Sequence, residues 1–257
     1  MCTLTVIPVD TTLGYRLVTN RDENRRRPAA LAPAAQRSGD RHWVWPVDPV
    51  GGGTWVGVGE HGVSLSILNV NLVPSPEMPG SDELTSRGLI IPRLASCATA
   101  LEAADAADRL DVERFAPFRL VIADRTHLCE AVWNRRALVV ARAAMGPACF
   151  VSHGMGDGLA APRLELWRAF LSRGVSPSMQ DEFHAHQWPD QPEISVMMDR
   201  EDARTVSVTA IEADESGVVV MDYRTDDANV RRAVGRASAR TDAGPSPRVR
   251  VAGPVRC

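Results

Sequence analysis

The stretch that decides the fold is MCTLTVIPVDTTLGYRLVTNRDENRRRP, residues 1–28. Residues 2–9 and 15–20 are apolar and rich in β-branched side chains, and a short polar segment, 10–14, separates them. This pattern predicts a β-hairpin that opens the chain. A short hairpin places the end of its second strand beside the start of its first, so the polar run that begins at residue 20 should lie next to Cys2.

Cys2 directly follows the initiator methionine, and this position permits two interpretations. In one, Cys2 is a small buried residue that begins a strand. In the other, Met1 is removed, and Cys2 becomes both the chain terminus and a nucleophile. A free α-amine has a pKa of about 7.7–8, which suits it as general base for a thiol whose pKa is about 8.5.

The hairpin brings Asn20, Arg21 and Asp22 near the Cys2 nitrogen. A nearby arginine favours the thiolate, and a nearby carboxylate orients the amine. The alternative for Arg21 and Asp22 is a surface turn with a local ion pair. If the catalytic interpretation holds, Cys2, Arg21 and Asp22 form a nucleophile with its own base and orienting charges.

Four motifs occur in order along the first part of the chain: MCT at the start, NRDE at 20–23, GGTWVGV at 52–58 and SRG at 86–88. Together they resemble the NRDE or transport-and-Golgi-organisation family. That family is similar to N-terminal nucleophile hydrolases, near the cysteine amidases that act on penicillin V, conjugated bile acids and ceramides. The resemblance implies an αββα sandwich, with two mostly antiparallel sheets between helix layers.

The resemblance also implies roles for particular residues. Cys2 matches the nucleophile, and Asp22 matches the aspartate that contacts its amine. Asn69 falls where the amidases keep an oxyanion-hole residue, a neutral amide that donates to developing negative charge. Arg204 falls where they carry a late arginine near the nucleophile. A strand-end turn for Asn69 and a hairpin salt bridge for Arg204 are the structural alternatives.

Two positions depart from the amidase pattern. Thr19 stands where the amidases usually have an arginine, three residues before the aspartate, and Arg21 is the nearest substitute. His153, in CFVSHG, replaces an asparagine, and a buried structural histidine is its alternative role. These two departures weaken the expectation of an amidase reaction more than they weaken the expected fold.

The rest of the chain supports an α+β fold. Strands are expected at 54–58, 63–69, 118–123, 128–133, 138–143, 149–152, 194–198, 205–212 and 218–223, with helices over about 85–110 and 161–174. Hairpins interrupted by helices predict two antiparallel sheets with helices outside. We expect one domain over 1–225 and a flexible tail, rich in Arg, Ala, Gly and Pro, over 226–257.

Composition excludes several classes of function. The net charge of -3 argues against a nucleic-acid partner, and the absence of lysine excludes Schiff-base chemistry on a lysine side chain. The five cysteines include no CxxC pair, which argues against a structural zinc site. His184 and His186 have metal-like spacing, on a predicted strand, but no convincing third ligand. We expect no metal, no cofactor and no membrane span, and without a secretory signal the expected location is cytoplasmic.

These observations lead to two functional hypotheses. The first is a cysteine N-terminal nucleophile hydrolase or acyltransferase that acts on an amide or thioester bond of a small acyl substrate, after autoprocessing or removal of Met1. The second, implied by the family resemblance, is a non-catalytic haem- or lipid-binding or trafficking protein on the same scaffold. Trp43, Trp45 and Trp55 are expected mainly in the core, where they could also line an apolar acyl pocket.

Overall fold

The computed structural model describes residues 2–80 and 82–234, which form two β-sheets packed face to face. The first sheet has the strand order β10-β1-β2-β11-β12-β13, with β1 Cys2–Val9, β2 Gly14–Asn24, β10 Ala148–Ser152, β11 Ala203–Ala213, β12 Val219–Arg224 and β13 Asn229–Val234. The second runs β3 to β9 in order: Leu31–Ser38, Arg41–Val47, Val56–Gly59, Ser64–Asn69, Phe118–Ala123, His127–Trp133 and Leu138–Ala144. All pairings between these strands are antiparallel.

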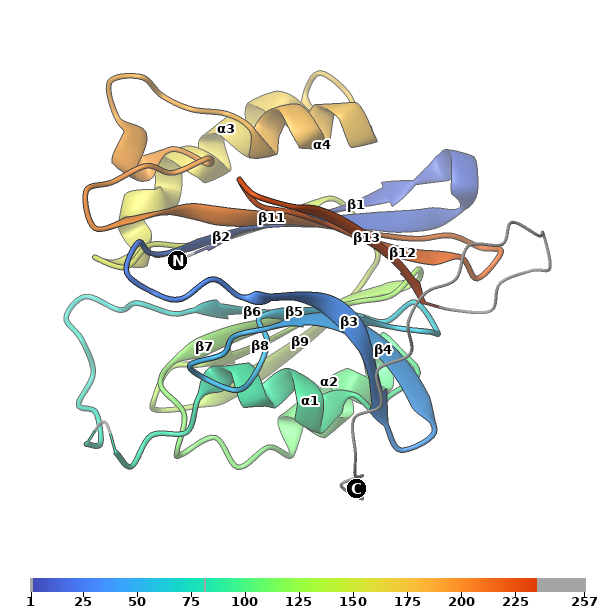
Figure 1. Ribbon diagram of the computed structural model, residues 1–257, viewed down its shortest axis with the longest axis horizontal. Helices are drawn as coiled ribbons and strands as arrows, with labels where there is room; N and C mark the ends of the chain where they lie inside the picture. Colours follow the sequence, from blue (N-terminus) through green and yellow to red (C-terminus); the bar gives the residue numbers. More distant parts are fainter. Residues whose placement is uncertain (1, 81, 235–257) are drawn as a thin grey trace.

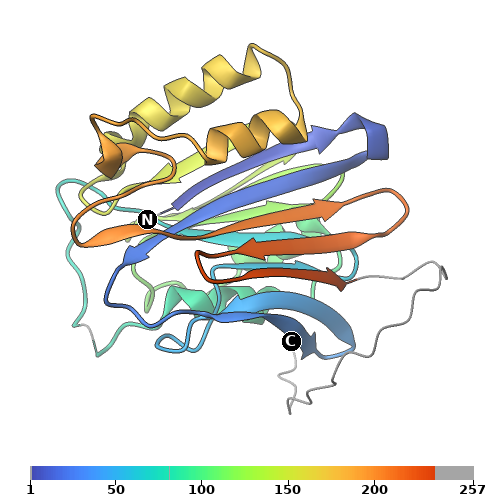
Figure 2. The ribbon, with the colours of Figure 1, turned by 45° about the horizontal axis from the view of Figure 1, so that its top comes forward.

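Helices cover the two outer faces of this pair of sheets (Figures 1 and 2). Helices α3 (Ala161–Leu171) and α4 (Pro177–His184) lie over the first sheet, and α1 (Ile90–Leu94) and α2 (Ala100–Asp108) lie over the second. Short 3-10 turns occur at Asp10–Thr12, Arg87–Leu89, Asp157–Ala160 and Pro192–Ile194. The predicted αββα sandwich is therefore confirmed. No helix in the described residues is long and apolar enough to cross a membrane.

The opening hairpin pairs β1 with β2 in a register that places Cys2 opposite Arg21 and Thr3 opposite Asn20. Because side chains alternate along a strand, β1 contributes to both faces of its sheet. Leu4 belongs to the large hydrophobic cluster that includes residues of both sheets, whereas Ile7 belongs to a second cluster that includes residues of α3 and α4. Both faces of β1 are covered, which explains its nearly continuous apolar sequence.

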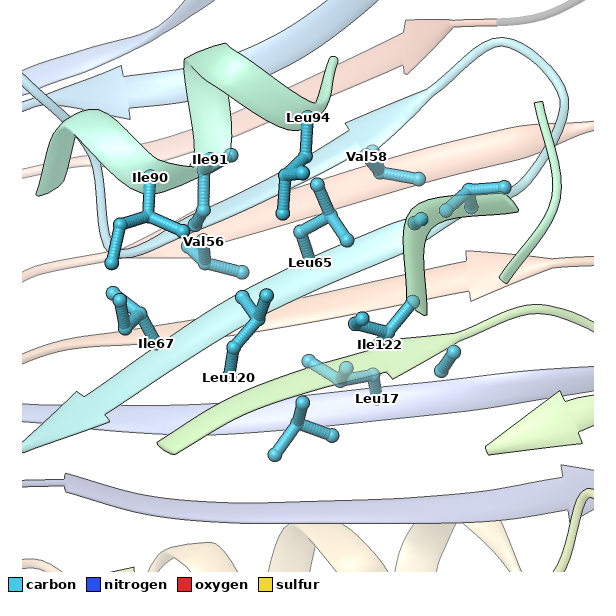
Figure 3. Packing of buried hydrophobic residues seen from close by; sticks show 14 of the residues in the cluster. Leu17, Val56, Val58, Leu65, Ile67, Ile90, Ile91, Leu94, Leu120 and Ile122 are labelled. Atoms are coloured by element: carbon cyan, nitrogen blue, oxygen red, sulfur yellow. The ribbon is translucent and has the colours of Figure 1, made fainter. Parts of the chain in front are cut away.

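The large cluster also fixes the second helix layer. Figure 3 shows Ile90, Ile91 and Leu94 of α1 directed toward strand residues such as Leu65 and Leu120. All five side chains are at most 2% exposed. Burial of this kind typically stabilises a fold by about 1.5–3 kcal/mol per large aliphatic side chain.

The structure corrects several of the predicted elements. The strand expected at 194–198 is a 3-10 turn, Pro192–Ile194, followed by irregular chain, because Pro192 fixes its own backbone angle and lacks an N–H. Helix α4 is absent from the sequence prediction, although its start has a clear local signal. The Ser176 side chain accepts a hydrogen bond from the Met179 N–H, and Pro177 occupies the first turn.

The segment expected as one helix over 85–110 is divided into a 3-10 turn, α1 and α2. The division has a local cause, since Thr99 caps a new helix by accepting a hydrogen bond from the Glu102 N–H. Strand β3, an exposed edge strand, escapes prediction because its sequence is mostly small and polar.

The expected start of the tail at residue 226 also requires correction. Asn229–Val234 forms β13, which pairs with β12 at the edge of the first sheet. NVRRAV is short and carries two adjacent arginines, so no strand pattern stands out in the sequence. The remainder of the predicted tail, 235–257, lies outside the described residues.

His184 lies at the end of α4, not on a strand, and it is buried in a hydrogen-bond network. Its Nδ1 is 2.8 Å from Asn20 Oδ1, and the Asn20 amide donates to the backbone carbonyls of His184 and Val196. Its Nε2 is 2.7 Å from Thr5 Oγ1, which accepts from Gln180. The Asn20 Oδ1 acceptor places a proton on Nδ1. Burial holds the pKa of His184 well below its usual value, so the ring is neutral.

Because the folded state binds no proton at His184 while the unfolded chain does below its pKa of about 6.5, acid should destabilise the fold. We expect the free energy of unfolding to fall between about pH 7.5 and 5, by up to about 1.4 kcal/mol per pH unit. In denaturant titrations, the free energy of unfolding of His184→Gln should depend less on pH than that of the wild type. The exposed His42→Gln should show no such weakening. An unchanged pH dependence in His184→Gln would contradict this account.

Candidate active site

A cavity of about 550 Å³ opens at the end of the sandwich where β1 begins. It is lined by the start of β1, the end of β2, the end of β6 and two loops that carry the GGT and SRG motifs. Its lining residues are Cys2, Arg21, Asp22, Glu23, Arg27, Asp48, Gly51, Gly53, Thr54, Trp55, Ile67, Asn69, Leu84, Thr85, Ser86, Arg87, Gly88 and Ala116.

Cys2 is 8% exposed and contributes to the wall of this cavity. Its backbone nitrogen donates a 3.0 Å hydrogen bond to Ser152 Oγ of the neighbouring strand β10. Burial raises the pKa of the Cys2 thiol, although the Arg21 charge and a hydrogen bond from the Asp22 backbone N–H lower it in part. The thiol is therefore protonated near neutral pH, and its use as a nucleophile requires a base.

Asp22 lies on the helix-facing side of the first sheet, together with Thr3. Its carboxylate accepts a 2.6 Å hydrogen bond from Thr205 Oγ1, and its second oxygen is 3.4 Å from Arg163 of α3. Arg163 also donates to Thr3 Oγ1 at 2.8 Å and to the Ile194 carbonyl at 2.9 Å. The side chains of Asp22 and Arg163 are both 0% exposed, so this is a fully buried ion pair.

The Cys2 nitrogen lies in the plane of the sheet, between its two faces. The Cys2 side chain faces the space between the sheets, whereas the Asp22 carboxylate faces α3. Strand β1 begins at Cys2, which is paired with Arg21, and β2 continues beyond this pair. Asp22 therefore lies just past the start of β1. This geometry fits a carboxylate that orients an α-amine at residue 2.

Arg21 is directly opposite Cys2 in the hairpin and shares its face. Its guanidinium lies 4.3 Å from the centroid of the Trp55 ring, within cation–π range. It also forms ion pairs with Glu23 at 3.1 Å and Asp48 at 3.2 Å. Arg21 is thus held beside Cys2, on the face of the sheet opposite to that of the Asp22 side chain.

Asp48 connects Arg21 to a second arginine. Arg27 lies 2.7 Å from Asp48 and 3.6 Å from Glu23. Burial acts to raise the pKa of Asp48, but the Arg27 hydrogen bond and the backbone N–H groups of Val50 and Gly51 outweigh it and lower the pKa. The two arginines and two carboxylates form one compensated network along the cavity wall.

The GGT and SRG motifs meet backbone to backbone. The Thr54 N–H donates to the Gly88 carbonyl at 2.9 Å. A Cβ atom at Gly53 would lie 2.3 Å from the Gly88 carbonyl carbon, so this contact requires glycine at residue 53. The contact fixes Arg87 at the cavity, where its guanidinium donates to the Pro117 carbonyl at 2.8 Å.

The other predicted site residues have different environments. Asn69 ends β6 and lines the cavity, and its side-chain amide has no hydrogen-bond partner within the described residues. His153 is fully buried outside the cavity lining, and burial lowers its pKa, which the Glu193 backbone offsets only in part. The structure therefore brings Asn69, but not His153, to the cavity with Cys2.

Arg204 does not reach the cavity. It pairs with Glu23 in the β2–β11 register, and its half-exposed side chain forms a 2.5 Å ion pair with Asp226. The physical reason is strand alternation, since the next residue, Thr205, is opposite Asp22 and takes the position beside its carboxylate.

Sequence reasoning misses three residues that complete the site: Ser152, Arg163 and Arg87. Ser152 contacts Cys2 and Arg163 contacts Asp22, and more than 100 residues separate the members of each pair in the sequence. No local sequence pattern therefore marks Ser152 or Arg163. Arg87 belongs to the SRG motif, so a signal is present without an assigned role.

Trp55 does line the cavity, whereas Trp43 and Trp45 lie outside its lining. Within residues 2–80 and 82–234, no group of three His, Cys, Asp or Glu side chains could hold a metal ion.

Comparison with solved structures places this architecture in a known class. The chain resembles a variant of conjugated bile acid hydrolase from Clostridium perfringens (TM-score 0.55, 11% identity, 91% of this chain and 92% of that one). It also resembles an N-acylethanolamine-hydrolyzing acid amidase ortholog from Caenorhabditis elegans (0.53, 12%, 82% and 92%) and penicillin V acylase from Agrobacterium tumefaciens (0.51, 12%, 90% and 84%).

These similarities and the strand arrangement define the fold as that of the N-terminal nucleophile hydrolases. The sequence is more specific about the family. Residues 1–157 match the profile of the family described as Transport and Golgi organisation 2, and the chain belongs to this family. No curated protein sequence matches the chain.

The buried Asp22–Arg163 pair predicts a large effect of removing one partner. Arg163→Gln should lower the free energy of unfolding by about 3–5 kcal/mol, because it removes the arginine charge that is paired with a buried carboxylate. The matched control is Arg168→Gln, an exposed arginine on the same helix. Urea denaturation followed by circular dichroism measures both, and a loss below about 1 kcal/mol for Arg163→Gln would contradict a structural role for the pair.

Proposed function

We propose that the chain is a cysteine N-terminal nucleophile hydrolase or acyltransferase that acts on an amide or thioester bond of a small acyl substrate. The observation that carries this proposal is the position of Cys2. Cys2 lines the cavity, its nitrogen lies beside Ser152 Oγ, and β2 continues to Asp22 directly after the Cys2–Arg21 pair. Removal of Met1 would turn this nitrogen into an amine beside the thiol.

In the proposed reaction the α-amine takes the proton from the Cys2 thiol, and the sulfur attacks the substrate carbonyl carbon. The resulting oxyanion needs hydrogen-bond donors that are already in place. Asn69 is the candidate donor, because its amide lines the same cavity and has no partner among the described residues. Arg21 adds positive charge beside the sulfur.

The tetrahedral intermediate then collapses. The bond from the carbonyl carbon to the leaving nitrogen or sulfur breaks, and the α-ammonium group returns its proton to that leaving atom. The acyl group remains on Cys2 as a thioester. Water attacks this thioester in a hydrolase, or an amine attacks it in an acyltransferase, and the α-amine again accepts the proton. Cys2 is released as a thiol.

Intact-mass analysis tests the proposal. The purified protein is incubated with a short-chain acyl thioester, and we expect one acyl group per chain on residue 2, followed by its loss with release of the free acid. Cys2→Ala should show neither step, because no nucleophile remains. Cys97→Ala should behave as the wild type, since Cys97 lies outside the cavity lining.

Retained Met1, or acylation that does not depend on Cys2, would reject the catalytic proposal. Saturable binding of haem or a lipid without turnover, unchanged in Cys2→Ala, would instead support a carrier on the same scaffold. The features that favour a carrier are Thr19 in the arginine position and the exclusion of His153 and Arg204 from the cavity lining.

A further inference from the structure

The charged side chains around the cavity are paired, with one exception. Arg21 and Arg27 share Glu23 and Asp48 in one network, and Asp22 is paired with Arg163. Arg87 has no carboxylate within ion-pair distance among residues 2–80 and 82–234. It is therefore the cavity's uncompensated cation.

Arg87 is also half-buried. Burial lowers the pKa of its guanidinium, and nearby Cys2 and Glu23 offset this only in part. One NH group is used by the Pro117 carbonyl, and the remaining donors face no acceptor within the described residues. A partly desolvated cation without an ion-pair partner is unfavourable, so an anion that enters the cavity would gain a charge-assisted interaction here. A guanidinium is well suited to hold a carboxylate through two parallel hydrogen bonds.

A second cavity of about 420 Å³ begins at the same arginine. Arg87 and Ala116 line both cavities, so the two cavities adjoin at these residues. The lining of the second cavity includes four apolar side chains that are unusually exposed: Leu72 at 40%, Val73 at 77%, Met78 at 36% and Met155 at 60%. Exposed apolar residues grouped in a hollow typically mark a binding surface.

We propose that Arg87 and this second cavity form a subsite for substrates that carry an anionic group close to the reactive carbonyl and an apolar arm beyond it. The inference deepens the proposed function and rests on it for the position of the carbonyl at Cys2. The order of these groups in the substrate follows the order of their partners in the site. Cys2 lines the first cavity, Arg87 lies at the junction of the two cavities, and the apolar hollow lies beyond it.

N-acylated amino acids with large apolar side chains have this chemistry. Their amide carbonyl is separated from the carboxylate by the amide nitrogen and one carbon atom, and that carbon also bears the side chain. With the carbonyl at Cys2, the carboxylate meets Arg87 and the side chain enters the hollow lined by Val73 and Met155. The acyl group occupies the remainder of the first cavity, near Trp55.

Ligand binding to the Cys2→Ala protein tests the subsite without requiring catalysis. By titration calorimetry we expect N-acetyl-L-phenylalanine to bind about tenfold or more tightly than its uncharged primary amide, since the carboxylate adds a charge-assisted hydrogen bond. Adding Arg87→Gln should reduce this ratio to about one. Adding Arg93→Gln removes an exposed arginine outside both cavities and should leave the ratio unchanged.

The apolar arm is tested in the same background. N-acetyl-L-phenylalanine should bind more tightly than N-acetylglycine, and Met155→Ser should weaken this preference, whereas Leu101→Ser, an exposed leucine on α2, should not. Equal binding of the acid and its amide, or a ratio that survives Arg87→Gln in a folded protein, would overturn the subsite. The subsite stands if these ratios hold while the wild type shows no acylation at Cys2, and only the catalytic proposal then fails.

Discussion

The pairing of β1 with β2 is the constraint on which the candidate site depends. Cross-strand pairing puts Cys2 opposite Arg21, and alternation then assigns the neighbouring residues to opposite faces. The thiol and Arg21 face the space between the sheets, while Thr3 and Asp22 face the helix layer and bind Arg163. A one-residue slip would exchange the two sets and leave Asp22 in the hydrophobic interior.

Two further contacts convert this hairpin into a cavity. The close approach of Gly53 to Gly88 joins the GGT and SRG loops, so motifs more than 30 residues apart in the chain form one wall. Asp48 then links Arg21 to Arg27, which fixes the loop after β4 to the end of β2. The motifs of the sequence thus correspond to physical contacts around the Cys2 thiol.

Much of this can be predicted from the sequence because the decisive contacts are local. The hairpin needs only the two apolar, β-branched runs and the short polar segment between them, and its register fixes Cys2, Arg21 and Asp22 together. Long-range partners leave no such pattern: Ser152 and Arg163 approach residue 2 only through the folded sheet and helix layer. Arg204 matches the family pattern by position, but strand alternation gives the place beside Asp22 to Thr205. Helix α4 escapes prediction although its capping serine and first-turn proline mark its start.

The central claim is that residue 2 carries a free α-amine and an accessible thiol on the same carbon skeleton. Reaction with 2-cyanobenzothiazole, which condenses with a terminal 1,2-aminothiol, measures this most directly, with the labelled residue located by peptide mass spectrometry. The account predicts one label per chain, on residue 2, and none in Cys2→Ala. A chain that retains Met1 and takes up no label would contradict it.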